Sequence, residues 1–184
     1  ARGSVATTWT LSTEMLDAAA RELLRAISLL AAEGIPRAYV ALLAKCLPSG
    51  NALRQRFAGG VDDDGTSMAN ELIASLHRLS LVSYTAGQTF SMHRLVQQVQ
   101  RDEILVTVEK GASDCAMLQG VIAVITHMTS RLTSYSDAEY SSWKDGAVLL
   151  QHGIALCSHS DREWKSRPAE LLARPVSYTH LRAH

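Results

Sequence analysis

The order of two hydrophobic periodicities limits the folds that this chain can adopt. Apolar residues recur at three- and four-residue steps, the spacing of an amphipathic helix, in three successive segments. These segments are Glu14–Glu33, Arg37–Leu47 and Thr66–Leu79. Two short alternating runs follow, Leu81–Tyr84 and Thr89–His93, around a linker that contains a glycine. Alternation on both sides of such a turn predicts a β-hairpin, so the sequence predicts three helices and then one hairpin.

Local signals set the expected ends of these helices. Ser12 or Thr13 can cap the first helix, and Thr66 or Ser67 can cap the third. Between the second and third helices, residues 49–66 lose the periodicity and contain a run of glycines and aspartates. This composition predicts an exposed loop.

A fourth helix is expected from Arg94 to about Leu105, with Leu95, Val96 and Val99 on its buried face. Three helices, a hairpin and a closing helix are the order of a winged-helix domain. We place this domain at residues 10–108.

Residues 109–174 are expected to be helical and to lead into a tetratricopeptide-like solenoid. Ala112–Leu132 and Asp137–Ser158 have helical spacing, and a further helix opens at Ser166. The second of these segments has an apolar stripe of Trp143, Ala147, Leu150 and Ile154. Residues 175–184 break the pattern and resemble translated sequencing-adapter sequence, so we expect them to be an artefactual tail. The predicted fold class is mainly α, a winged-helix domain followed by helices.

Charge and cysteine usage narrow the function classes. Lysine plus arginine and aspartate plus glutamate number 18 each, which argues against a chain that mainly binds nucleic acid or an anionic membrane surface. No apolar run approaches the roughly 18–20 residues that a membrane span needs. The three cysteines are far apart and match no disulfide framework or zinc motif. We expect a cytoplasmic protein with no membrane partner and no metal.

His93 is the candidate binding residue. Side chains alternate along a strand, so Phe90 and Met92 share the core face while His93 lies on the outer face. The next helix begins at Arg94, and the N–H groups at a helix start bind anions. An imidazole there can donate to a phosphate oxygen, or it can simply cap the helix. The pattern leaves both interpretations open.

Several segments resemble one known family. Leu79–Val82, the hairpin and Phe90–Gln97 are similar to the winged-helix part of NB-ARC proteins, the STAND-class nucleotide switches, particularly fungal and bacterial members with tetratricopeptide tails. Thr8–Ser12 and Ala20–Pro36 resemble the start of the same module. The similarity covers about Thr8 to Leu105.

The resemblance implies a role for His93. In that family, the histidine of a Met-His pair contacts the β-phosphate of bound ADP and holds the resting, closed state. By resemblance, Met92, His93 and Arg94 form this site here. Plant members carry an aspartate where this chain has Arg94, so the contact made by that aspartate is not implied.

The resemblance also implies partners. Residues 1–9 would link to an upstream nucleotide-binding domain acting in cis, and repeats that bind protein partners would follow. The chain has no Gly-x-x-x-x-Gly-Lys-Ser/Thr sequence, the loop that holds phosphates. We therefore expect no catalytic residue, no hydrolysis of ATP by this chain alone, and no tight binding of ADP or ATP without the parent protein.

Weaker candidates and other functions remain. We expect Asp62–Gly65 to be a solvated loop and no calcium site, because the ligand spacing fails. His127, His152 and His159 are expected to be surface or partly buried residues, Cys115 and Cys157 core residues, and Trp143 and Trp164 packing anchors. One alternative function is a DNA-binding winged helix that reads DNA with the third helix, which offers Asn70, Glu71, His77 and Arg78 but no basic stripe. Another is a helical interaction module without a nucleotide link.

Overall fold

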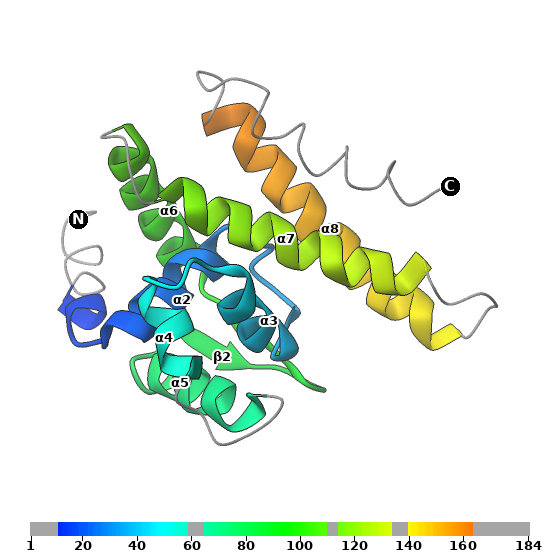
Figure 1. Cartoon of the computed structure of the whole chain (residues 1–184), viewed down its shortest axis with the longest axis horizontal. Coiled ribbons are helices and arrows are strands. Elements are labelled where there is room, and N and C mark those ends of the chain that lie inside the picture. The colour runs from blue at the N-terminus through cyan, green and yellow to red at the C-terminus, as the bar shows by residue number, and fades with distance from the viewer. Residues whose placement is uncertain (1–10, 59–64, 110–113, 134–139, 164–184) are drawn as a thin grey trace.

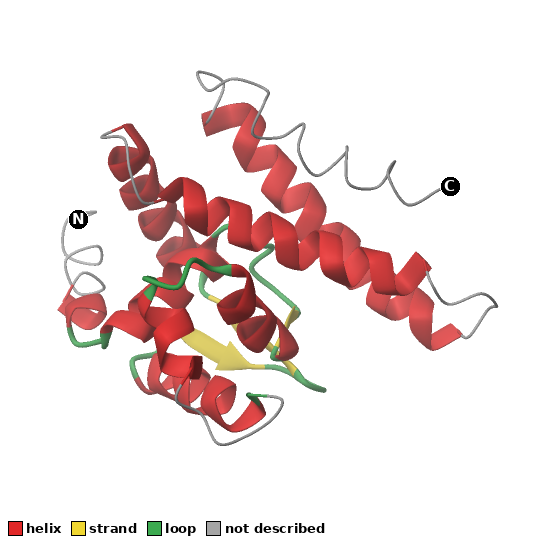
Figure 2. Ribbon diagram, in the orientation of Figure 1, coloured by secondary structure: helices red, strands yellow, loops and turns green. Residues whose placement is uncertain are grey.

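The computed structural model describes residues 11–58, 65–109, 114–133 and 140–163, and it shows a mainly helical protein with one small sheet (Figure 1, Figure 2). The elements are α2 (Ala18–Ser28), β1 (Ile35–Pro36), α3 (Ala38–Cys46), α4 (Ala52–Ala58), α5 (Thr66–Arg78), β2 (Val82–Tyr84), β3 (Thr89–Met92), α6 (Arg94–Glu109), α7 (Asp114–Thr133) and α8 (Tyr140–Glu163). The segments 166–174 and 175–184, Trp164 and Asp62–Asp64 lie outside the described residues, and so does the side chain of His159. Among the helices described, none is long and apolar enough to cross a membrane.

Helix α2 is shorter than the sequence predicts. Asp17 is its N-cap, and the Asp17 carboxylate accepts a hydrogen bond from the Ala20 N–H at 2.7 Å. A carboxylate cap of this kind fixes the start of a helix, so the predicted start at Glu14 and the predicted Ser12 or Thr13 cap were wrong. The helix ends at Ser28, and residues 29–34 form a turn, which we call the α2–β1 turn.

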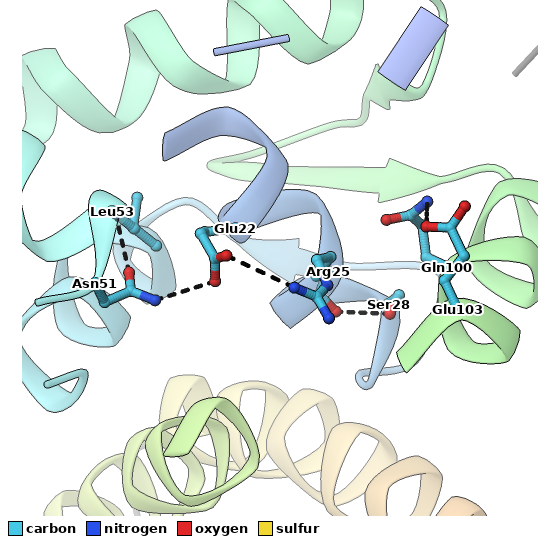
Figure 3. A network of polar contacts seen from close by, with 7 residues as sticks. All are labelled: Glu22, Arg25, Ser28, Asn51, Leu53, Gln100 and Glu103. Atoms are coloured by element: carbon cyan, nitrogen blue, oxygen red, sulfur yellow. Dashed lines mark hydrogen bonds and ion pairs between the residues drawn. The ribbon is translucent and has the colours of Figure 1, made fainter. Parts of the chain in front are cut away.

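The loop expected at residues 49–66 contains the short helix α4. Figure 3 shows its anchor, Asn51, whose Oδ1 accepts from the Leu53 N–H at 2.9 Å while its Nδ2 donates to the Glu22 carboxylate of α2 at 3.0 Å. Glu22 also forms an ion pair with Arg25 at 3.7 Å. Leu53 is fully buried against the core. The loop prediction missed this helix because seven residues are too few to show a clear period.

Helix α5 starts after Gly65, whose φ of 71° lies in the left-handed region, and it has no side-chain cap. The predicted cap by Thr66 or Ser67 was therefore wrong. A Cβ at Gly65 would lie 2.9 Å from Cε1 of Phe57, so both the backbone conformation and the close approach of Phe57 require glycine here.

The predicted hairpin is confirmed, and the structure adds a third strand to it. Strands β2 and β3 pair antiparallel, with Val82 opposite Met92 and Tyr84 opposite Phe90. Strand β1 pairs with the other edge of β3, with Ile35 opposite Phe90, so the order is β1-β3-β2. A two-residue strand has no alternation to recognise, and the sequence gives no other sign of it. Strand β3 is the central strand and leads directly to His93.

The core lies between the sheet and the apolar faces of α2, α3 and α5, and α7 closes one side of it. Its largest fully buried side chains include Leu23, Leu24, Ile27, Ile35, Ile73 and Phe90. Helix α7 packs on α3 so closely that a Cβ at Gly120 would lie 2.8 Å from Cδ2 of Leu47. Helix α8 returns along α7 (Figure 1).

The sides of α6 and α8 that are buried differ in part from those that the sequence predicts. Helix α6 buries Val96 and half-buries Val99 as expected, but Leu95 is 55% exposed and the polar residues Gln97 and Gln100 are buried instead. On α8 the predicted stripe faces outward, because Leu150 is 64% exposed, Ile154 is 56% exposed and Ala147 is also exposed. The buried side of α8 carries Leu149, His152 and Leu156. The side chain of Trp143 lies outside the described residues.

Candidate functional site

The candidate site lies where β3 ends and α6 begins. His93 is the single residue between them, and its side chain is exposed, as the alternation of the strand predicts. The His93 N–H donates to the Leu81 carbonyl at 3.4 Å, and the His93 carbonyl accepts from the Gln97 N–H at 3.0 Å. Backbone bonds on both sides thus hold the residue at the start of the helix.

The ring of His93 caps α6. Its Nδ1 accepts a hydrogen bond from the Leu95 N–H at 3.3 Å. An acceptor nitrogen has no proton, so a neutral ring in this geometry carries its proton on Nε2. The tautomer is therefore the one in which the outer nitrogen, Nε2, is a donor. The same geometry serves a helix cap and a ring that donates to an anion.

The two neighbours of His93 have opposite environments. Met92 is buried in the core at 3% exposure, so it fixes the end of β3 and does not face a ligand. Arg94 is exposed and pairs with Glu33 of the α2–β1 turn, with 3.2 Å between Nη2 and Oε1. The structure thus presents His93 and Arg94 on the surface and places Met92 beneath them.

Residues of β3 and α6, which are distant in the sequence, form hydrogen bonds and an ion pair with the α2–β1 turn. The Leu30 carbonyl accepts from Nε2 of Gln97 on α6 at 2.6 Å. The Ala32 carbonyl accepts from the Met92 N–H at 2.8 Å. Together with the Glu33–Arg94 pair, these bonds connect the turn to both elements that flank His93.

His152 of α8 makes the remaining bonds of this turn. Its Nδ1 accepts from the Ala31 N–H at 3.1 Å, and its Nε2 lies 3.3 Å from the Gly34 carbonyl, to which it donates. The ring is 0% exposed and meets the edge of the Tyr39 ring, with centroids 5.6 Å apart. Burial lowers the pKa of His152, and the bond to the Gly34 carbonyl opposes this shift. The expectation of a surface or partly buried residue was wrong, because a partner 121 residues away in the chain satisfies this ring.

Three of the four polar side chains considered for DNA reading, those of Asn70, Glu71 and His77, are bonded within the molecule. Asn70 accepts from Arg37 at 3.4 Å, Glu71 pairs with Arg56 at 2.8 Å, and Nδ1 of His77 lies 3.0 Å from the Val82 carbonyl. Asn70, Glu71 and His77 are therefore committed to Arg37 at the start of α3, to α4 and to β2.

The cysteines and the other histidines form no site among the described residues. No group of three metal-ligating side chains occurs there. Cys157 is exposed, so its predicted core position was wrong, and the side chain of Cys115 lies outside the described residues. Cys46 is also exposed; partial burial raises the pKa of its thiol, and Arg54 opposes the shift. His127 is exposed on α7.

Comparison with known proteins identifies one family. A family model described as a domain of unknown function (DUF7779) matches residues 11–107, which include His93 and end within α6. No curated protein and no solved structure gave a significant match to the chain.

Proposed function

The chain belongs to the DUF7779 family, and on this premise we propose that it carries the regulatory winged-helix module of an NB-ARC (STAND-class) nucleotide-switch ATPase. The parent protein would bind ADP or ATP in an upstream nucleotide-binding domain. The module would close over ADP in the resting state and move away on nucleotide exchange. Helices α7 and α8 would lead into tetratricopeptide-like repeats that bind protein partners in the cytoplasm.

The observation that carries this proposal is the geometry of His93. The ring is exposed at the first turn of α6, where N–H groups and the positive end of the helix dipole favour an anion. Because Nδ1 accepts from the Leu95 N–H, the ring proton is on Nε2 and can be donated to a terminal phosphate of ADP. Arg94 adds a positive charge beside it, and buried Met92 keeps the junction rigid.

The experiment compares ADP dissociation from the full-length parent protein and from two His93 variants. One hydrogen bond to a charged group is worth about 1.5–3 kcal/mol, so His93→Ala should speed ADP release roughly 10- to 150-fold. His93→Asn is the matched control, because an asparagine carboxamide can still accept from the Leu95 N–H at an N-cap but lacks the Nε2 donor.

The two variants separate a phosphate contact from a cap. Fast release from both variants supports the phosphate contact. Release at the wild-type rate from His93→Asn and faster release from His93→Ala would assign His93 to helix capping alone. Equal release from all three proteins would remove His93 from the switch and favour a helical interaction module without a nucleotide link.

A DNA-binding function is the weaker alternative. The recognition helix would be α5, whose Asn70, Glu71 and His77 are already bonded to other parts of the protein. The hairpin tip, Thr85–Gln88, has no lysine or arginine. Without a basic stripe, little of the phosphate attraction that drives DNA binding is available.

A further inference from the structure

We propose that His152 is a positioning residue that couples the α7–α8 hairpin to the Met92–His93 junction through the α2–β1 turn. The inference rests on the proposed function for the meaning of the junction. The coupling itself is a property of this chain and can be measured without nucleotide.

The first step is the bond between α8 and the turn. His152 accepts from the Ala31 N–H and donates to the Gly34 carbonyl, so one side chain binds the turn at two places. Only a neutral ring with its proton on Nε2 satisfies both groups. Both bonds form away from water, where an unmatched backbone N–H or carbonyl is costly. The position of α8 therefore fixes the position of the turn.

The second step leads from the turn to the junction. Ala32, between the two residues that His152 binds, accepts from the Met92 N–H at 2.8 Å. Glu33 pairs with Arg94, and Leu30 accepts from Gln97 one turn further along α6. Each residue from Leu30 to Gly34 thus contacts α8 or one of the two elements that flank His93. A displacement of the turn must stretch at least one of these bonds to β3 or α6.

This arrangement gives the downstream part of the protein a route to the nucleotide site. A partner or a repeat that pulls α8 away breaks both His152 bonds and releases the α2–β1 turn. The end of β3 then loses its bond to Ala32, and the junction at His93 is held by its bonds to Leu81 and Gln97 without support from the turn. In the proposed switch, the consequence is faster release of ADP.

The test measures amide hydrogen exchange in this chain for the wild type, His152→Phe and Tyr39→Phe. Phenylalanine keeps an aromatic ring at position 152 but makes neither hydrogen bond. Loss of a hydrogen bond corresponds to about a 2- to 13-fold change in a local opening equilibrium. We expect the amides of Ala31 and Met92 to exchange roughly 10-fold faster in His152→Phe, with the Leu95 amide changed in the same direction. The Ile73 and Leu76 amides of α5 should stay within about 2-fold of wild type, because a local opening leaves α5 closed.

Two controls separate coupling from general destabilisation. Tyr39→Phe removes a buried hydroxyl that has no hydrogen-bond partner in the described part of the chain and keeps the ring that touches His152, so its Met92 exchange should match wild type. His152→Asn keeps an acceptor in place of Nδ1 and loses the donor to Gly34, so it should lie between wild type and His152→Phe. Unchanged Met92 exchange in a folded His152→Phe would overturn the proposal, as would one common factor at all amides, including those of α5.

Two further results cover the remaining outcomes. If His152→Phe does not fold, His152→Asn decides, with acceleration at Met92 but not at Ile73 as the supporting result and its absence as the refuting one. In the full-length protein, His152→Phe should speed ADP release in the same direction as His93→Ala. Faster exchange of the Met92 amide in His152→Phe, with no effect of His152→Phe or His93→Ala on ADP release, would refute the proposed function and leave the coupling intact. An effect of His93→Ala on ADP together with unchanged Met92 exchange in His152→Phe would refute the coupling alone.

Discussion

The body of the protein, residues 11–109, and the α7–α8 hairpin bury their side chains by different rules. In the body, most elements turn their most apolar face inward, as α2 does with Leu23, Leu24 and Ile27, although α6 exposes Leu95 and buries Gln97 and Gln100. Helix α8 instead leaves Leu150 and Ile154 in solvent and buries His152 completely. The face of α8 that docks carries Leu149 and Leu156 and also the His152 ring, which bonds two backbone groups of the α2–β1 turn.

The difference shows that hydrophobic burial and docking specificity can come from separate residues. Apolar contacts such as Leu149 and Leu156 can form in several rotations of a helix, because they have no direction. The His152 bonds form in one rotation only, because hydrogen bonds need a defined geometry. The outward stripe of Ala147, Leu150 and Ile154 is the cost of that choice.

Two adjacent leucines on α8 provide the strongest test of which side of this helix is buried. Leu149 is 5% exposed and Leu150 is 64% exposed. Leu149→Ala should lower the free energy of unfolding by about 2–4 kcal/mol, because it removes buried methylene groups and leaves a cavity. Leu150→Ala should change it by less than about 0.5 kcal/mol. Urea denaturation of both variants checks the pair, and equal losses would mean that α8 is rotated from the position described.

Replacing each of two glycines of the α7–α8 hairpin by alanine should change the free energy of unfolding in opposite directions. Gly120→Ala places a Cβ 2.8 Å from the buried Leu47 side chain, and overpacking of this kind costs about 1–3 kcal/mol, which exceeds the gain of about 0.5–1 kcal/mol from the better helix propensity of alanine. Among the described residues, Gly153→Ala meets only Ile125 at 4.0 Å, so the same gain should stabilise the protein by about 0.5–1 kcal/mol. Thermal unfolding gives both signs. A Gly120→Ala variant that is stabilised as much as Gly153→Ala would show that α7 does not lie tightly against the end of α3.

The smallest expected effect is a pH dependence that belongs to His152. Its pKa is lowered in the folded protein from the ordinary 6.5, so the unfolded chain takes up the proton first as the pH falls. The free energy of unfolding should therefore decrease from pH 6.5 downward until the folded ring is also protonated. Between pH 6.5 and 5.5 the unfolded chain binds more protons at this site than the folded protein does, so stability is lost as the pH falls through this range.

The comparison with His152→Asn isolates this contribution from the other histidines. The groups near the ring do not offset it, because burial raises the pKa of Tyr39 and keeps the phenol neutral, while Glu33 pairs with Arg94. The free energy of unfolding should fall more between pH 6.5 and 5.5 in wild type than in His152→Asn. Equal differences would show that the ring is accessible to protons in the folded state.

The sequence predicted those features that depend on local order. The helical period predicted α3 and α5, and strand alternation predicted the β2–β3 hairpin and placed His93 outside and Met92 inside. The sequence did not predict β1, whose pairing with Phe90 depends on a segment 55 residues away. It also missed His152, because no local pattern marks a histidine whose partners are backbone groups of a distant turn. The exposed side of α8 was predicted to be its buried side, since apolar content alone does not say which side faces a neighbour.

The distance along the chain between His152 and its partners has a consequence for synthesis. The 121 residues that separate Ala31 from His152 take about 6–24 s to translate at about 5–20 residues per second. During that time the β2–β3 hairpin and α6 emerge from the ribosome, while the Ala31 N–H and the Gly34 carbonyl cannot yet form their hydrogen bonds with His152. The nascent chain can therefore complete the body before the turn beside His93 is fixed, and α8 adds that last constraint after its emergence from the exit tunnel. Arrested nascent chains that end before and after His152 emerges should differ in protease sensitivity at residues 29–34, and equal sensitivity would mean that the turn closes without α8.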